Sequence, residues 1–244
     1  MFAAAKLHAM YRIGNAVVRP FPCPHLCVDD VFPKAFYAEI QRHRLPDTAY
    51  SRLVDTGRVG KAYSAARLSL FPEELDAAPV ADETRAFWRR MFETFNDREF
   101  AGLWLDLFGA AIRAHLSEAT SRDGQSDRRP MGSEIFLMRD LESYSLGPHT
   151  DSPLKVVSVL FYLPPDDDAT GLGTSFYLPK DRGFTCAGGP HHPFDGFDRV
   201  ATMLYRPNTL VAFPKTRRSF HGVEPVIGAD ARRDLMLYDL KLRE

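Results

Sequence analysis

The second half of the chain is a series of short apolar runs separated by turn residues, and this pattern limits the fold more than any other feature. The clearest run, at 155–163, is rich in Val, Leu, Phe and Tyr, and the pair Pro164-Pro165 follows it and ends any strand there. Further strands are expected at 134–138, 171–178, 209–213, 222–226 and 232–238. Such a series predicts an antiparallel barrel or sandwich.

The first half of the chain predicts helices instead of strands. Apolar side chains recur at helical spacing along 81–95 and 98–116, which indicates two helices packed against the sheet. Shorter helices are expected after Pro33 and at 72–78, because a first helical turn tolerates proline. Residues 117–132 are polar and contain Gly and Pro, which predicts a flexible loop.

Length and composition indicate a single soluble domain. A chain of 244 residues with 45% hydrophobic side chains can bury one sizeable core. We expect one domain over 1–244, with a helical support region and flexible loop at 1–132 and a β core at 133–244. The net charge of −1 provides no field that would attract nucleic acid or an anionic membrane. No apolar run reaches the roughly 18 residues that span a bilayer.

The cysteines and the N-terminus give an indication of the cellular compartment in which the protein is found. Cys23, Cys27 and Cys186 are odd in number and match no common zinc spacing, so we interpret them as reduced thiols. The N-terminus lacks the basic segment and apolar core that mark a signal peptide. These features favour a cytoplasmic protein.

A histidine and a carboxylate stand one residue apart in Pro148-His149-Thr150-Asp151. On an extended strand His149 and Asp151 would project to the same face, because side chains alternate with a period of two. The chain has 8 histidines, so one such pair can arise by chance and the surroundings must decide. His221 precedes a predicted strand and can supply a second imidazole. Two histidines and one carboxylate on one side of a metal suit non-haem Fe(II) and oxygen chemistry.

An arginine at the start of the last predicted strand can hold an anion beside such a metal. A buried guanidinium needs an anionic partner, and its planar fork suits a carboxylate. The sequence offers Arg232 and Arg233 at this place, and the hydroxyl of Tyr162 can reach the same carboxylate. A ligand with an α-keto acid group would then chelate the metal while its far carboxylate binds the arginine and Tyr162.

Together these motifs resemble those of the Fe(II)/2-oxoglutarate-dependent dioxygenases, most closely the prolyl-4-hydroxylase-like branch. The resemblance rests on His-Thr-Asp at 149–151, Phe-Tyr-Leu-Pro at 161–164, Ser-Phe-His-Gly-Val-Glu-Pro-Val at 219–226 and the last, arginine-containing strand. It covers about residues 134–240. It implies a mainly β fold with α, in which N-terminal helices support a double-stranded β-helix (jelly-roll) core.

The same resemblance implies roles for individual residues. Fe(II) would bind His149, Asp151 and His221, which would form the catalytic centre. The cosubstrate 2-oxoglutarate would chelate the iron and place its distal carboxylate on Arg232 and Tyr162. Molecular oxygen, O2, would be the second cosubstrate.

The choice of Arg232 over Arg233 follows from the family pattern. That pattern puts the arginine and a small residue two positions later on the cavity face, and Asp234 occupies the second position for Arg232. Arg233 would share the opposite face with Leu235 and Leu237. We therefore expect Arg232 to face the cavity, although Asp is larger and more charged than the usual residue.

A second departure from the family lies ahead of the metal pair. Many relatives carry a tyrosine and a glycine about nine and six residues before the first ligand, where this chain has Asp140 and Ser143. Tyr144 can do part of the work of the missing tyrosine. Histidines 191 and 192 lie in the predicted 179–199 loop, where they can contact a substrate but cannot both serve one metal.

The resemblance implies a hydroxylase that couples oxidation of a C–H bond to decarboxylation of 2-oxoglutarate to succinate and CO2. Asp151 favours hydroxylation, because halogenating members lack this carboxylate. The expected substrate is a small molecule or a protein side chain, with no nucleic acid or membrane partner, and the 179–199 loop could close over it. The alternatives are a jelly-roll metal-binding protein and a cupin-like enzyme without 2-oxoglutarate chemistry. Neither would need the arginine and Tyr162. The sequence does not indicate an oligomeric state.

Overall fold

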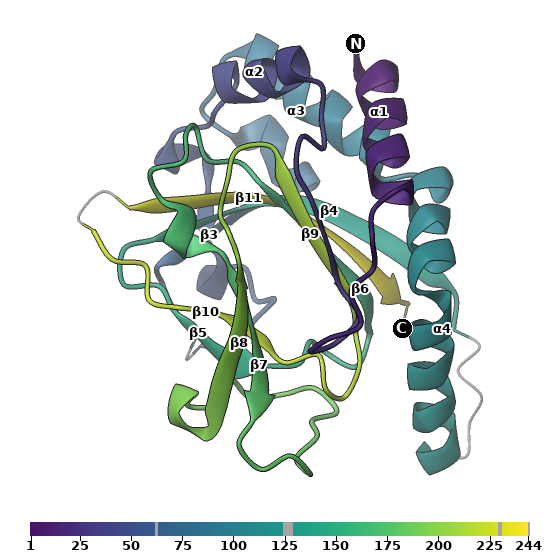
Figure 1. The fold of residues 1–244 in the computed structure, drawn as a ribbon. Coiled ribbons are helices and arrows are strands. Elements are labelled where there is room, and N and C mark those ends of the chain that lie inside the picture. Colours follow the sequence, from purple (N-terminus) through teal and green to yellow (C-terminus); the bar gives the residue numbers. More distant parts are fainter. Residues whose placement is uncertain (62, 124–128, 229–230, 244) are drawn as a thin grey trace.

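Two antiparallel sheets face each other, and helices cover the outer side of the larger sheet (Figure 1). The computed structural model of the protein describes residues 1–61, 63–123, 129–228 and 231–243. The larger sheet contains, in spatial order, β1 (Leu26–Val28), β9 (Thr209–Pro214), β6 (Lys155–Tyr162), β11 (Arg232–Leu242), β4 (Met131–Leu141), β3 (Arg67–Leu70) and β2 (Ser51–Arg52). The smaller sheet contains β5 (Leu146–His149), β10 (His221–Val223), β7 (Thr174–Pro179) and β8 (Phe197–Met203).

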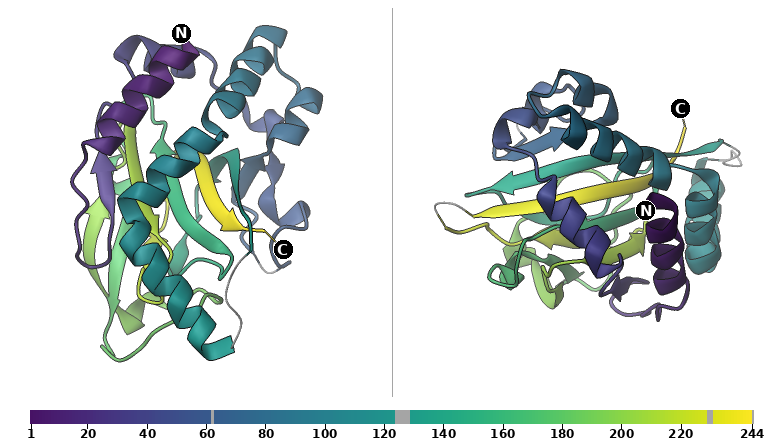
Figure 2. Two further views of the ribbon diagram at one scale, coloured as in Figure 1. Left: turned by 90° about the vertical axis from the view of Figure 1, so that its right-hand side faces the viewer. Right: turned by 90° about the horizontal axis from the view of Figure 1, so that it is seen from above.

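The helices come from the first half of the chain. They are α1 (Phe2–Gly14), α2 (Lys34–Arg42), α3 (Asp82–Phe95) and α4 (Arg98–Asp123). Short 3-10 turns lie at Asp47–Ala49, Leu53–Asp55, Pro72–Ala77, Thr170–Leu172 and Phe194–Gly196. Helices α1 and α4 lie side by side across the larger sheet (Figure 2). Within the described part of the chain, no helix has the length and apolar character needed to cross a membrane.

Aromatic side chains join the helices to the larger sheet. Phe100 of α4 is fully buried, and its ring centroid lies 5.1 Å from that of Tyr238 on β11 and 6.3 Å from that of Phe161 on β6. Its other ring neighbours are Phe95, at the end of α3, and Trp104, one turn further along α4. These large rings remove much apolar surface from water. The apolar faces of α3 and α4 therefore pack against the sheet, as the sequence predicts.

Strand β11 presents opposite faces to two separate cores. Met236 and Tyr238 pack with the helices in the outer core, whereas Leu235 and Leu237 belong to the inner core between the sheets. Arg233 shares the inner face with these leucines, because side chains alternate along a strand. This phase of β11 decides which arginine enters the interior.

The sequence analysis missed α1 and ended α4 too early. Ala5, Ala9 and Ile13 of α1 recur every fourth residue and are buried, but two of the three are alanines, which give a weak hydrophobic signal. Helix α4 continues through Asp123, so the flexible loop predicted at 117–132 is wrong in its first part. Residues 124–128 of that segment lie outside the described residues.

Three further differences concern the strands. Strand β8 lies partly within the loop predicted at 179–199. It is an edge strand whose side chains are mostly exposed or half-buried, so it carries no apolar run. Strands β2 and β3 occupy a segment for which the sequence predicted no structure. Strand β5 ends at His149, so Asp151 lies beyond the strand and not on it.

Replacing the central ring of the outer core should destabilise the fold. We expect Phe100→Ala to lower the free energy of unfolding by about 3–5 kcal/mol, since it removes a buried ring and leaves a cavity. The matched change Leu105→Ala, on an exposed position of the same helix, should cost no more than about 0.5 kcal/mol. Urea unfolding of both variants measures the difference. Equal losses would show that Phe100 does not anchor α4.

Candidate metal centre and adjoining pocket

Three buried side chains meet at one end of the smaller sheet. His149 ends β5 and His221 begins β10, and the antiparallel register places them directly opposite each other. Their ring centroids are 4.3 Å apart, and Nε2 of His221 lies 3.8 Å from Oδ2 of Asp151. The ligand atoms of all three residues lie within 4.8 Å of one another. Among the described residues, this is the one group of His, Cys, Asp and Glu close enough to hold a metal ion.

Backbone carbonyls orient the two imidazole rings. Nδ1 of His149 is paired with the carbonyl of Gly147, and Nδ1 of His221 with that of Ser219, each at 3.0 Å. A proton on Nδ1 leaves the lone pair on Nε2 to face the centre, which is the arrangement of metal-binding histidines. Burial lowers the pKa of both rings, and for His149 the neighbouring His221 lowers it further. Both histidines are therefore neutral near pH 7, as metal ligation requires.

The carboxylate of Asp151 is held in its charged form. Burial raises its pKa, but the nearby Lys155 ammonium, together with either histidine when it is protonated, outweighs burial and keeps the pKa well below its ordinary value. The hydroxyl of Ser158 donates to Oδ2 at 2.8 Å. Two neutral imidazoles and one carboxylate form a donor set that fits a first-row divalent metal such as Fe(II).

The structure places Arg233, not Arg232, in the interior. Arg232 points outward, with its side chain 37% exposed, and its Nη2 donates to Oδ2 of Asp47 at 2.8 Å. The side chain of Arg233 is 0% exposed and donates to the carbonyl of Leu172 at 2.6 Å and to Oγ1 of Thr174 at 3.0 Å. The expectation that Arg232 faces the cavity is wrong, because β11 turns its even-numbered residues toward the helices.

Comparison with solved structures places this architecture among known folds. A prolyl hydroxylase from Trichoplax adhaerens, in complex with a hypoxia inducible factor peptide fragment, matches with a TM-score of 0.50 and 10% identity over 98% of this chain and 90% of that one. A 2OG-Fe(II) oxygenase from Burkholderia pseudomallei gives 0.47 and 13%, over 97% and 89%. A prolyl-4-hydroxylase from Pseudomonas putida gives 0.46 and 12%, over 100% of both chains. No protein-family model and no curated protein sequence matches the chain.

The fold is that of the Fe(II)/2-oxoglutarate oxygenases. The jelly-roll core with N-terminal helices, which the sequence predicted, is therefore confirmed. The family resemblance is confirmed at the level of the fold, together with the buried His149, Asp151 and His221 group.

Two buried arginines of the larger sheet share one carboxylate. Arg67 on β3, Asp140 on β4 and Arg233 on β11 are direct cross-strand neighbours in the larger sheet. Arg67 binds both oxygens of Asp140, at 2.6 and 2.9 Å, and Nη1 of Arg233 donates to Oδ2 at 2.9 Å. Their side chains are 9%, 0% and 0% exposed. The cluster therefore carries one positive charge in excess, and an anion would balance it.

The sequence analysis did not identify Arg67 and noted Asp140 only as a departure from the family. The short apolar run 68–71 after Arg67 is the signal that could have placed it on a buried strand. Tyr162, which was identified, lies on the inner face of β6 with its ring centroid 5.6 Å from the guanidinium carbon of Arg233. Its hydroxyl accepts from the backbone N–H of Thr174 at 2.8 Å.

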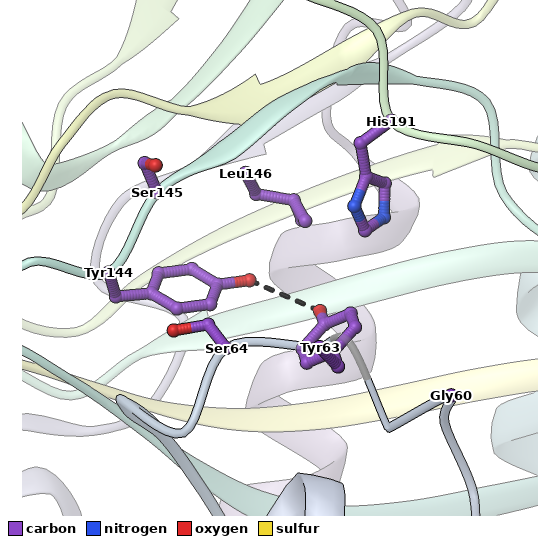
Figure 3. Close-up of a pocket in the computed structure, with 7 residues that line it drawn as sticks. All are labelled: Gly60, Tyr63, Ser64, Tyr144, Ser145, Leu146 and His191. Carbon is purple, nitrogen blue, oxygen red and sulfur yellow. Dashed lines mark hydrogen bonds between the residues drawn. The ribbon is translucent and has the colours of Figure 1, made fainter.

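A pocket of about 450 Å³ adjoins the metal centre and the arginine cluster through their neighbours, with His191 beside His149 and with Tyr63 and Tyr144 beside Arg67. Figure 3 shows its walls, which are Gly60, Tyr63, Ser64, Tyr144, Ser145, Leu146 and His191. The hydroxyls of Tyr63 and Tyr144 are 3.2 Å apart, and Arg67 donates to the hydroxyl of Tyr63 at 3.3 Å. The Arg67 guanidinium also lies 4.1 Å from the centre of the Tyr144 ring. The cation behind these phenols makes the pocket suited to an anionic or hydrogen-bond-accepting group.

The long loop before β8 supplies the wall of this pocket that lies nearest to the candidate ligand His149. The backbone N–H of His192 donates to the carbonyl of Pro148 at 2.9 Å, which fastens the loop to β5. The contact needs a glycine at 147, because a Cβ there would lie 2.2 Å from the carbonyl oxygen of His192. As a result the ring of His191 lies 4.7 Å from that of the ligand His149. His191 therefore lines the pocket, whereas His192 packs among phenylalanines.

A buried lysine contacts Thr150, the residue between the candidate ligands His149 and Asp151. Lys215 follows β9, is 1% exposed, and donates to Oγ1 of Thr150 at 2.7 Å. Burial lowers its pKa from 10.5 to about 8, although the charge of Asp151 partly opposes this shift. Between about pH 8 and 10.5 the unfolded chain binds more protons at this residue than the folded chain does, so stability from this group rises with pH.

Removing the amine should therefore stabilise the protein most at neutral pH. We expect Lys215→Met to unfold at higher urea concentration than the wild type at pH 7, where folding must desolvate the charged ammonium. This advantage should shrink by pH 10. The exposed Lys180→Met is the matched control and should show no such pH dependence. A constant difference between Lys215→Met and wild type across this range would contradict the shift.

Loss of either imidazole should remove metal binding. Changes around metal ligands cost about 10- to 100-fold in affinity, so loss of a ligand itself in His149→Ala or His221→Ala should cost at least ~100-fold. The control His191→Ala removes a neighbouring pocket imidazole and should stay within about tenfold of wild type. Titration with Co(II), followed by visible absorption, measures all three. Equal affinities would exclude a metal centre at these residues.

Proposed function

We propose that the protein is an Fe(II)- and 2-oxoglutarate-dependent dioxygenase that hydroxylates a C–H bond of its substrate. One observation carries the proposal. The buried His149, Asp151 and His221 group and a buried arginine cluster with one positive charge in excess adjoin the same inner core, where His221 packs on Phe213 and Arg233 lies beside Tyr162. A cation site and an anion site thus border one inner core between the two sheets, which suits a metal and a dicarboxylate cosubstrate.

The three metal ligands would already have the protonation state and the orientation that metal binding needs. His149 and His221 hold Nε2 toward the centre by fixing Nδ1 on backbone carbonyls, and Asp151 stays ionised beside Lys155. No ligand needs to lose a proton or rotate before binding, so little reorganisation is required. When bound, Fe(II) supplies the oxygen chemistry that decarboxylates 2-oxoglutarate to succinate and CO2 and oxidises a substrate C–H bond.

The distal carboxylate of 2-oxoglutarate would bind Arg233 and Tyr162. A guanidinium has five N–H donors, and Arg233 uses three of them on Leu172, Asp140 and Thr174. The other two are available to a carboxylate. Arg67 neutralises Asp140, so the charge of Arg233 is left for the cosubstrate.

The pocket beside His191 would receive the substrate. Its volume of about 450 Å³ lies within the usual range of small-molecule sites. This supports a small molecule or a single protein side chain as substrate. Tyr63 and Tyr144 would orient it through their hydroxyls, and His191 would separate it from the ring of His149. A net charge of −1 favours neither nucleic acid nor a membrane as partner.

Cys23, Cys27 and Cys186 are free thiols, which supports a cytoplasmic location. A metal-binding jelly-roll protein or a cupin-like enzyme would use the same three ligands without 2-oxoglutarate. Either alternative would leave the excess charge of the Arg67 and Arg233 cluster without a purpose.

The adjacent arginines provide a matched pair of variants. We expect Arg233→Met to weaken binding of 2-oxoglutarate to the Mn(II)-loaded protein by about 30-fold or more, because it removes a buried charge partner worth about 2–5 kcal/mol. Arg232→Met, on the outward face, should bind like wild type. Anaerobic calorimetric titration measures the affinities, and iron-dependent succinate formation measures turnover.

The outcomes separate the competing functions. Weak binding in Arg232→Met with normal binding in Arg233→Met would reject Arg233 as the anchor. A wild type that binds metal but no 2-oxoglutarate would reject the dioxygenase and favour the metal-binding or cupin-like alternative. Circular dichroism checks that Arg233→Met is folded, which the remaining pair of Asp140 with Arg67 should allow.

A further inference from the structure

The two oxygens of the ligand Asp151 have different surroundings. Oδ2 accepts from Ser158 at 2.8 Å and is the oxygen that lies 3.8 Å from Nε2 of His221. Oδ1 lies 3.2 Å from the ammonium of Lys155. A carboxylate oxygen bound to an ammonium is a poor ligand for a second cation, so the two oxygens differ in their availability to a metal.

Lys155 is itself held by three side-chain oxygens, although its side chain is 20% exposed. Its ammonium lies 3.0 Å from Oδ2 of Asp239 and 3.5 Å from Oγ of Ser158, in addition to Asp151. These three contacts match the three N–H donors of an ammonium group. Its backbone N–H donates to the carbonyl of Ser152 at 3.0 Å, which closes the turn between the ligand and β6. The side chain of Lys155 therefore has little freedom to leave Asp151.

Asp239 shows that this arrangement is more than a chance ion pair. It lies on β11 directly opposite Ser158 of β6, and its side chain is 2% exposed. Its Oδ1 has no hydrogen-bond partner among the described residues. Burying a second carboxylate in this way is costly, and a buried ion pair rarely adds net stability. Stability therefore does not explain the group, and its contact with a metal ligand suggests a role there.

We propose that Lys155 is a positioning residue that holds Oδ1 of Asp151, so that only Oδ2 is available to a metal ion, and that Asp239 keeps Lys155 in this place. The inference rests on the metal site of the proposed function. Carboxylates bind cations through one oxygen or through two. A second bound oxygen would occupy one more position on the ion and leave fewer positions for cosubstrate and oxygen.

Water relaxation by bound Mn(II) tests the proposal without any turnover. Mn(II) takes about six ligands, so one donor atom from each of three residues leaves about three positions for exchangeable water. In Lys155→Met both oxygens of Asp151 become available, and one water position is lost. We expect the water-proton relaxivity per bound Mn(II) to fall by about one third. Lys155→Arg, which keeps a cation and N–H donors, should restore the wild-type value.

A second variant separates the effect on the metal site from a loss of folding. Lys155→Met leaves the buried Asp239 with only the more distant Lys241, 3.8 Å away, and breaking a buried ion pair can cost about 3–5 kcal/mol. The double variant Lys155→Met/Asp239→Asn removes both charges and should show the same one-third fall. Equal relaxivity in wild type and double variant, both loaded with Mn(II), would overturn the role of Lys155 and leave the metal site intact. A wild type that binds no Mn(II) would overturn both.

Discussion

The antiparallel pairing of β5 with β10 is the interaction on which the candidate site depends. It brings His149 opposite His221 although the two residues are far apart in sequence. The pairing requires a glycine at 222, because a Cβ there would lie 2.4 Å from the carbonyl oxygen of Leu146. The register also shifts between His221 and Val223, and such irregularities commonly redirect side chains beside functional sites. Strand β5 ends at His149, and the following turn carries Asp151 to the same point.

The helices contribute to this site only indirectly, through β11. Strand β11 is buried on both faces. Tyr238 therefore packs under α4 on one face, while Arg233 enters the interior from the opposite face. A sheet that is covered on both sides can carry charged residues on its inner face only if they are paired. Arg233 meets this condition through cross-strand contact with Asp140, which Arg67 reaches from the far side. The N-terminal half thus supplies both the outer core and one member of the charge cluster.

The sequence predicted the residues that local patterns determine. His149, Asp151 and His221 could be identified from the His-x-Asp spacing and the family resemblance, whereas the strands themselves predicted an antiparallel barrel or sandwich. The phase of β11 could not be predicted, because the residues after Arg232 and Arg233 are, apart from Asp234, apolar on both faces. With Leu235 and Leu237 on one face and Met236 and Tyr238 on the other, alternation says nothing about which face is inner. Arg67 was missed for a related reason: only pairing of β3 with β4 gives it a partner.

The two buried charge clusters have opposite net charge. At the metal end, Lys155 lies between Asp151 and Asp239, and these three groups carry one negative charge in excess, with the partly exposed Lys241 3.8 Å from Asp239. At the other end, Arg67 and Arg233 surround Asp140 and leave one positive charge in excess. An isolated buried charge is costly, so each cluster reduces the cost by internal pairing and retains one uncompensated charge. A ligand set that placed a cation at the first cluster and a carboxylate at the second would neutralise the excess charge of both.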